Sequence, residues 1–236
     1  MDENGNRCYH DGVVSPDAPN WKNPTLFVAP VVYVVDDEPL ALNGLCRLLR
    51  SVGREVQAFD SPESFLHAAR GDMGGCLLLD VQMPVLNGLD LQVRLVAAGC
   101  HLPIIFLTGH GDVAMSVRAM KAGAVDFLIK PVQEKDLFEA IERALERDAR
   151  ERGLRRKLSE ISQKIAALTP REHEVFALVV TGMLNKQIAD RIGTTEKTVK
   201  VHRGRVMSKM SARSLADLVR MAGRLGVPAQ VAQGNP

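Results

Sequence analysis

The chain has 236 residues, of which 46% are hydrophobic and 25% charged, a composition typical of a globular protein and not of a disordered one. No apolar run approaches the ~20 residues that span a bilayer, and the acidic N-terminus lacks the pattern of a signal peptide. The formal net charge of +2 hides an asymmetry, because residues 1–30, 31–152 and 153–236 carry net charges of −2, −5 and +9. We therefore expect two functions in one cytoplasmic chain without a membrane segment.

The first part of the chain changes character near residue 31. Residues 1–30 have no repeating apolar pattern, and we predict a mobile N-terminal tail there. Five short apolar, β-branched runs then begin near Val31, Glu55, Cys76, Pro103 and Val125, with room for one helix between each pair. Strands that are apolar throughout are typical of a parallel sheet covered by helices. Residues 31–150 are therefore predicted to form a doubly wound α/β domain with a five-stranded parallel sheet of order 2-1-3-4-5.

A long, heavily charged helix is predicted over residues 134–168. Leucine and isoleucine recur in it at heptad spacing, at Leu154, Leu158, Ile161, Ile165 and Leu168. About two heptads are present, fewer than the three or four that indicate a coiled coil. Two interpretations of residues 151–167 stay open: a seam between two copies of the chain, or a linker helix that packs on its own domain.

The remaining residues show only helical patterns. Helices are expected over 170–181, 185–192, 195–209 and 214–224, with Gly182 and Gly193 at the joins. Thr169 and Pro170 form an N-cap followed by proline at the first helical position. We predict an all-α four-helix domain over residues 168–228 and a short tail over 229–236.

Polar side chains end the expected strands. In a parallel sheet, ligands bind at the carboxyl ends of the strands near the point where the chain order reverses. In the order 2-1-3-4-5 the second strand lies at the edge of the sheet, so Asp60, which follows that strand, is excluded from the ligand site. The remaining strand ends place three carboxylates face to face, with a hydroxyl and an amine on the other side: Asp36, Asp37 and Asp80, then Thr108 and Lys130.

Three neighbouring carboxylates need a positive charge to neutralise them. Mg²⁺, or Mn²⁺ in its place, fits because these cations take oxygen ligands and also accept substrate phosphate. Lys130 adds a second positive charge, and the Thr108 hydroxyl can donate to a phosphoryl oxygen. The pocket therefore suits phosphoryl transfer, with Asp80 as a nucleophile that becomes an aspartyl phosphate.

Four segments, VVDDEP, LLLDVQMPVLNGL, LTGHGD and AVDFLIKP, resemble the receiver domain of bacterial two-component response regulators over about residues 31–150. The resemblance implies that Asp80 accepts a phosphoryl group from a sensor histidine kinase. It also implies a metal site formed by Asp80 together with Asp37 directly, Asp36 mainly through water, and the backbone carbonyl of Gln82.

The resemblance further implies that Thr108 and Phe127 form a coupled switch pair within a regulatory segment, residues 108–130. Receivers of the family often carry tyrosine where Phe127 stands, so no signal through a ring hydroxyl is expected. His110 is interpreted as a loop residue beside the site and not as an acid or base, since a phosphorylatable aspartate needs no protein base.

The segment with a net charge of +9 suits a polyanion such as DNA. In the helix over 195–209, Val199, Val206 and Met210 share a face directed to the core. A second face carries Lys197, Lys200, Val201 and Gly204, flanked by Arg203, Arg205 and Lys209. This pattern, preceded by the short helix 185–192, predicts a helix-turn-helix whose second helix enters the major groove.

The segment LTPREHEVFALVVTGMLNKQIADRIGTTEKTVKVHRGRVMSKM resembles the LuxR-type DNA-binding domain over residues 168–228. Behind the receiver-like part, it makes the whole chain similar to FixJ/NarL-class regulators, and most of all to FixJ-like ones. The resemblance implies base contacts by Lys200 and Val201, whereas Gly204 departs from relatives with a larger polar residue. Phosphate or framework contacts are implied for Asn185, Lys186, Thr198, His202, Arg205 and Lys209.

These observations predict a transcription regulator, by resemblance an activator, that is switched on by phosphorylation of Asp80. The expected partners are a sensor histidine kinase, promoter DNA, RNA polymerase and a second copy of the chain. The last helix of one copy would pair with the last helix of the other. We also hypothesise that the acidic residues 1–152 bind the basic residues 153–236 in the inactive state, until Asp80 is phosphorylated.

Three alternatives compete with this prediction. A Mg²⁺-dependent aspartyl phosphohydrolase needs an acid two residues after its nucleophile, where this chain has Gln82. We therefore predict no enzyme beyond the receiver's own phosphoryl transfer and dephosphorylation. A small-molecule sensor of the same DNA-binding class is disfavoured by the carboxylate-rich pocket. A receiver that only docks a partner is disfavoured by the intact set of Asp80, Thr108 and Lys130.

Overall fold

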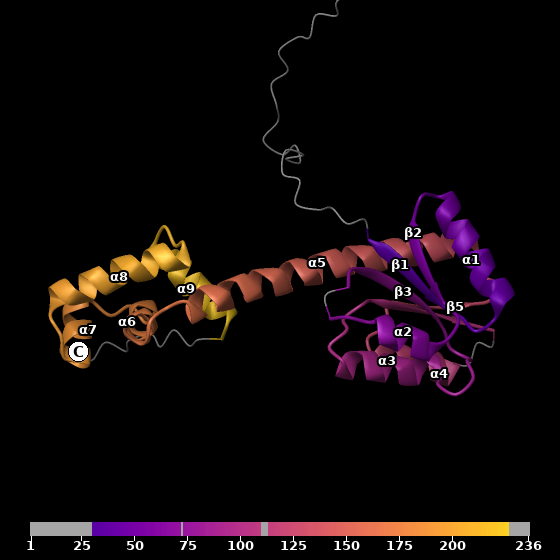
Figure 1. The fold of residues 1–236 in the computed structure, drawn as a ribbon, viewed down its shortest axis with the longest axis horizontal. Coiled ribbons are helices and arrows are strands. Elements are labelled where there is room, and N and C mark those ends of the chain that lie inside the picture. The colour runs from indigo at the N-terminus through magenta and orange to yellow at the C-terminus, as the bar shows by residue number, and fades with distance from the viewer. Residues whose placement is uncertain (1–29, 72, 110–112, 227–236) are drawn as a thin grey trace, which may run out of the picture.

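The computed structural model describes residues 30–226 except 72 and 110–112. Apart from Pro30, the tails expected over 1–30 and 229–236 lie outside the described residues, as does His110. The described part consists of an α/β body and a helical body, joined by one long helix (Figure 1).

Five parallel strands form a single sheet of order β2-β1-β3-β4-β5, which confirms the predicted fold class and strand order. The three central strands are buried along their whole length, because their apolar runs face helices on both sides. The edge strands β2 and β5 are partly exposed. The strands are β1 (Val31–Val35), β2 (Glu55–Phe59), β3 (Gly75–Asp80), β4 (Ile104–Thr108) and β5 (Asp126–Ile129).

Helices cover both faces of the sheet (Figure 1). Successive strand residues point to opposite faces, so Tyr33 and Leu77 pack in one core cluster and Val34 and Leu78 in another. The first cluster lies under α2 (Pro62–Ala68), α3 (Gly88–Ala97) and α4 (Val113–Lys121). The second lies under α1 (Pro39–Ser51) and the N-terminal part of α5 (Glu134–Ala166).

Helix α5 has 33 residues and belongs to both bodies. The buried Asp148 carboxylate accepts a hydrogen bond from the backbone N–H of Gly75 at 2.8 Å, which fastens α5 to the start of β3. Farther along, Ile161, Ile165 and Leu168 pack into the core of the helical body, whereas Leu154 is 57% exposed. The second half of the heptad pattern therefore packs within one copy of the chain, in the core of the helical body.

The helical body contains α6 (Pro170–Val180), α7 (Asn185–Ile192), α8 (Glu196–Met210) and α9 (Leu215–Arg224). These bounds lie within one residue of the expected ones. The N-cap at Thr169 is confirmed as a capping box with Glu172, and Gly193, with φ of 65°, ends α7 in the left-handed conformation. In the described part of the chain, no helix is long and apolar enough to cross a membrane.

Candidate functional site

Three of the predicted site residues meet at the carboxyl ends of the strands. Asp36 follows β1, Asp80 ends β3 and Lys130 follows β5. Both aspartates are buried, since Asp36 is 1% exposed and Asp80 is 4% exposed. Lys130 Nζ lies 2.7 Å from Asp36 Oδ2 and 2.7 Å from Asp80 Oδ1. The sequence placed Lys130 across the site from the carboxylates, whereas its ammonium group lies between them.

Backbone donors hold the other carboxylate oxygens. The N–H of Glu38 donates to Asp36 Oδ1 at 3.0 Å, and the N–H of Gln82 donates to Asp80 Oδ2 at 2.8 Å. Each carboxylate is therefore bonded through both oxygens, and these bonds fix its orientation.

Burial and pairing act in opposite directions on these groups. Burial raises the pKa of the Asp80 carboxyl above its usual value, while its bond to Lys130 opposes the shift. For Lys130, burial lowers the pKa, but the hydrogen bonds from its ammonium to Asp36 and Asp80 outweigh burial and hold the pKa above its usual value. Lys130 is thus a cation at neutral pH, and its single positive charge lies beside two carboxyl groups.

A pocket of about 280 Å³ opens beside these side chains, lined by Asp36, Asp37, Glu38, Asp80, Gln82, Gly109 and Lys130. Within the described residues no three His, Cys, Asp or Glu side chains form a group that could hold a metal ion by themselves. Mg²⁺ is usually bound by one or two carboxylates and keeps several waters. The exposed Asp37 and the central Asp80 match that donor set.

The two predicted switch residues lie on adjacent strands. Thr108 is fully buried at the end of β4, and its carbonyl accepts a hydrogen bond from the N–H of Lys130 at 2.7 Å. Phe127, on β5, is partly buried against the first core cluster, with its ring centroid 6.2 Å from that of Phe106. The peptide bond between Lys130 and Pro131 is cis.

The helical body presents a basic surface on α8. Val199, Val206 and Met210 are buried in its core, as the sequence predicted. The opposite side is exposed and includes Lys197, Lys200, Val201, Gly204 and Arg205. Figure 1 places α8 at the far end of α5 from the sheet, so the α/β body does not cover this helix in the present arrangement.

Family models match both bodies. The response regulator receiver domain matches residues 32–142, and the luxR family of bacterial regulatory proteins matches residues 166–222. Nodulation protein W of Bradyrhizobium diazoefficiens is 49% identical to this chain over 84% of the chain and 88% of the relative. The transcriptional regulatory protein FixJ of Azorhizobium caulinodans is 42% identical over 83% and 93%. This chain belongs to the FixJ-like response regulators.

Solved structures agree with this assignment. The response regulator StyR aligns with a TM-score of 0.76 at 46% identity, over 83% of this chain and 98% of that chain. Full-length FixJ from B. japonicum aligns with a TM-score of 0.51 at 40% identity, over 85% and 98%. The chain is thus a two-component response regulator with a LuxR-type DNA-binding domain, a transcription regulator and not a classical enzyme.

One residue that shapes the receiver site was missed by the sequence reasoning. A Cβ on Gly88 would lie 2.4 Å from the carbonyl oxygen of Asp80, so only glycine lets the start of α3 approach the end of β3 this closely. The N–H of Gly88 donates to the carbonyl of Val81 at 3.0 Å. The Asn-Gly pair at residues 87–88 was the available signal, since Asn87 caps α3.

Three predicted DNA contacts of this regulator, Asn185, Arg203 and Lys209, have partners inside the domain. Lys209 Nζ lies 2.6 Å from Glu172 Oε2 and donates to the carbonyl of Ala167 at 3.1 Å. Arg203 donates to Asn185 Oδ1 at 3.1 Å, which joins α8 to α7. Of the two roles predicted for Lys209, phosphate contact or framework, its geometry fits the framework role.

Proposed function

We propose that this response regulator is switched on when Asp80 accepts a phosphoryl group from a sensor histidine kinase. The observation that carries the proposal is the position of Lys130 Nζ, 2.7 Å from both Asp36 and Asp80, beside an open pocket. A fixed ammonium group at the reacting carboxylate is the arrangement that phosphoryl transfer by positioning and charge neutralisation requires.

The reaction uses one oxygen of Asp80 as the nucleophile. It forms a bond to phosphorus while the bond from phosphorus to the donor breaks, and the leaving group keeps the electron pair. Lys130 neutralises negative charge near the incoming oxygens, and the Thr108 hydroxyl donates to one of them in the activated state. Mg²⁺, or Mn²⁺, held by Asp36, Asp37, Asp80 and the Gln82 carbonyl would supply further neutralisation.

The signal then passes through residues 108–130 to α5. Thr108 moves toward the phosphoryl group and the Phe127 ring turns inward, which repacks α4 and β5. Two arginines of α5 support this route: Arg143 pairs with Asp126 of β5, and Arg147 donates to the carbonyl of Gly123 at 3.2 Å. Because α5 continues into the core of the helical body, a change at its N-terminal half reaches the DNA-binding domain.

Phosphorylation leads to a homodimer that binds paired half-sites on promoter DNA and activates transcription by RNA polymerase. Lys200 and Val201, exposed on α8, face the bases. Side chains around them contact phosphates or support the helix: Asn185, Lys186, Lys197, Thr198, His202, Arg203, Arg205 and Lys209. The net charge of +9 over residues 153–236 supports binding to a polyanion.

The test compares wild type with Asp80→Asn and with Asp60→Asn as the matched control, an exposed carboxylate that also follows a strand. Each protein is incubated with Mg²⁺ and a radiolabelled acyl phosphate, with and without EDTA. Label, sedimentation and DNA binding by fluorescence anisotropy are measured, followed by run-off transcription on a promoter selected by binding.

Wild type and Asp60→Asn are expected to gain label, dimerise and bind DNA more tightly, only when Mg²⁺ is present. Asp80→Asn is expected to gain none of the three. Equal labelling of Asp80→Asn, or labelled wild type that stays monomeric with unchanged DNA affinity, would contradict the proposal.

A further inference from the structure

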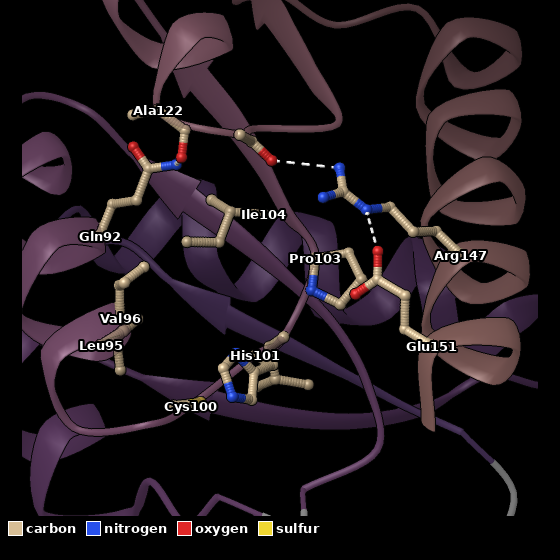
Figure 2. A pocket seen from close by; sticks show the side chains of 12 residues that line it. Gln92, Leu95, Val96, Cys100, His101, Pro103, Ile104, Ala122, Arg147 and Glu151 are labelled. Atoms are coloured by element: carbon tan, nitrogen blue, oxygen red, sulfur yellow. Dashed lines mark hydrogen bonds and ion pairs between the residues drawn. The ribbon is translucent and has the colours of Figure 1, made fainter. Parts of the chain in front are cut away.

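A second cavity lies at the opposite end of the sheet from Asp80. It is bounded by α3, by the loop that leads into β4, by the turn that follows α4, and by α5 (Figure 2). Its volume is about 140 Å³. For comparison, an apolar cavity of about 150 Å³ holds one benzene molecule.

The two sides of this cavity differ in chemistry. One side is mostly apolar and includes Val96 of α3 and Ile104 at the start of β4, with the polar side chains of Gln92 and His101 at its margins (Figure 2). The other side carries Arg147 and Glu151 of α5. A ligand that fits both sides has an apolar body about one ring in size and a single polar group.

Arg147 decides which polar group the cavity accepts. Its Nη1 donates to the carbonyl of Gly123 at 3.2 Å and its Nε donates to Glu151 Oε1 at 2.8 Å. The third guanidinium nitrogen is directed into the cavity (Figure 2) and has no hydrogen-bond partner among the residues that the structure describes. Guanidinium N–H groups only donate, so the matching ligand group is an acceptor, a carboxylate or a carbonyl.

Glu151 does not reverse this preference. Its carboxylate is already bonded to Arg147 and lies 3.6 Å from Arg155 Nη1, so two cations surround it. A ligand ammonium would have to compete with both arginines for this carboxylate. An acceptor on the ligand meets the third guanidinium nitrogen of Arg147, whose N–H groups have no partner in the described part of the chain.

We propose that this cavity binds a small aromatic molecule that carries one carboxylate or carbonyl group, with the ring against Val96 and Ile104 and the acceptor on Arg147. The site is separate from the phosphorylation chemistry and does not depend on it. Two of its lining residues do contact the proposed signalling segment, residues 108–130. Gln92 donates to the carbonyl of Ala122 at 3.1 Å, and Arg147 donates to the carbonyl of Gly123. A bound ring would therefore stabilise the turn between α4 and β5.

Benzoate and benzamide are the probes, titrated into the full chain and followed by ¹H–¹⁵N NMR and calorimetry. For a ligand of this size we expect a dissociation constant of about 1 mM. Val96→Trp fills the cavity, and Arg147→Met removes the donor while keeping an apolar stem. Ala97→Trp is the matched control, because Ala97 is exposed on the same helix and does not line the cavity.

Each probe is expected to bind wild type and Ala97→Trp with the same affinity. Each probe should bind Val96→Trp and Arg147→Met at least about tenfold more weakly. The shifted NMR signals should lie around Val96, Ala122 and Arg147. Unchanged affinity in both cavity variants, no saturable binding to wild type, or equally tight binding of benzylamine would overturn the proposal. Tighter binding of benzoate than of benzamide would support the proposal with a carboxylate as the acceptor on Arg147.

Discussion

Lys209 Nζ lies 2.6 Å from Glu172 Oε2, although Lys209 belongs to the helix that is proposed to enter DNA. The same carboxylate oxygen accepts the N–H of Thr169 at 2.9 Å, and Lys209 also donates to the carbonyl of Ala167. The pair of Glu172 and Lys209 thus connects the start of α6, the end of α8 and the residue that follows α5. The bonds from Lys209 and Thr169 lower the pKa of Glu172 to about 2.

Glu172→Gln is expected to destabilise the helical body in a pH-dependent way. Glutamine preserves the capping box, so the substitution mainly removes the charge that pairs with Lys209. The folded-state pKa of Glu172, about 2, lies below its ordinary value of 4.5. The stabilisation is therefore fully present above pH 4.5 and is lost as the pH falls toward 2.

Urea unfolding of wild type and Glu172→Gln between pH 7 and pH 2 measures this effect. The difference in the free energy of unfolding should be constant above pH 4.5 and should shrink below it. Glu174→Gln is the control, since Glu174 is exposed on the same helix and pairs with Arg171 across one turn. A difference that stays constant down to pH 2 would show that charge pairing is not its source.

The framework role of Lys209 predicts how DNA binding responds to salt. A phosphate contact adds about 0.9 to the slope of log affinity against log salt concentration. Arg205→Ala should therefore reduce the slope by about 0.9. Lys209→Met should leave it unchanged, even where the substitution lowers stability. Fluorescence anisotropy on a DNA duplex over a series of salt concentrations measures both slopes. If Lys209→Met reduced the slope as much as Arg205→Ala, Lys209 would contact a DNA phosphate.

Removing Lys130 should make the receiver less stable and more responsive to Mg²⁺. Lys130→Met leaves Asp36 and Asp80 as neighbouring buried carboxylates without their common cation. Breaking a fully buried pair costs about 3–5 kcal/mol, and the partial exposure of Lys130 reduces our expectation to about 2 kcal/mol.

Because the freed carboxylates attract a cation more strongly, Mg²⁺ should raise the melting temperature of Lys130→Met more than that of wild type. Thermal unfolding with and without Mg²⁺ measures the shift. Lys135→Met is the control, an exposed lysine near the start of α5. Equal Mg²⁺ shifts in all three proteins would argue against a cation site at these carboxylates.

The parts of the fold that follow from local pattern were predictable. The buried strands are recognisable as continuous apolar runs. Thr169-Pro170 and Gly193 mark helix ends, because few residue types serve as helix caps or adopt a positive φ. The strand-end rule brought Asp36, Asp80 and Lys130 to one site.

Long side chains and close backbone approaches were not predictable. The Lys130 and Lys209 side chains each have four methylene groups, so backbone position alone does not fix whether the ammonium group faces solvent or a carboxylate. The contact of Gly88 with the Asp80 carbonyl depends on how α3 docks on β3, which no local pattern specifies.

The first and second halves of the heptad pattern, represented by Leu154 and Ile161 of α5, should respond differently to truncation. Ile161 is 6% exposed in the helical core and Leu154 is 57% exposed. Ile161→Ala is expected to lower the free energy of unfolding by about 2–4 kcal/mol, and Leu154→Ala to change it by less than about 0.5 kcal/mol. Urea unfolding measures both, and sedimentation of the phosphorylated proteins tests the alternative. If the pattern is a seam between two copies, Leu154→Ala would weaken the dimer while leaving the monomer stable. If α5 is a linker that packs on its own domain, the dimer of Leu154→Ala will be as stable as that of wild type.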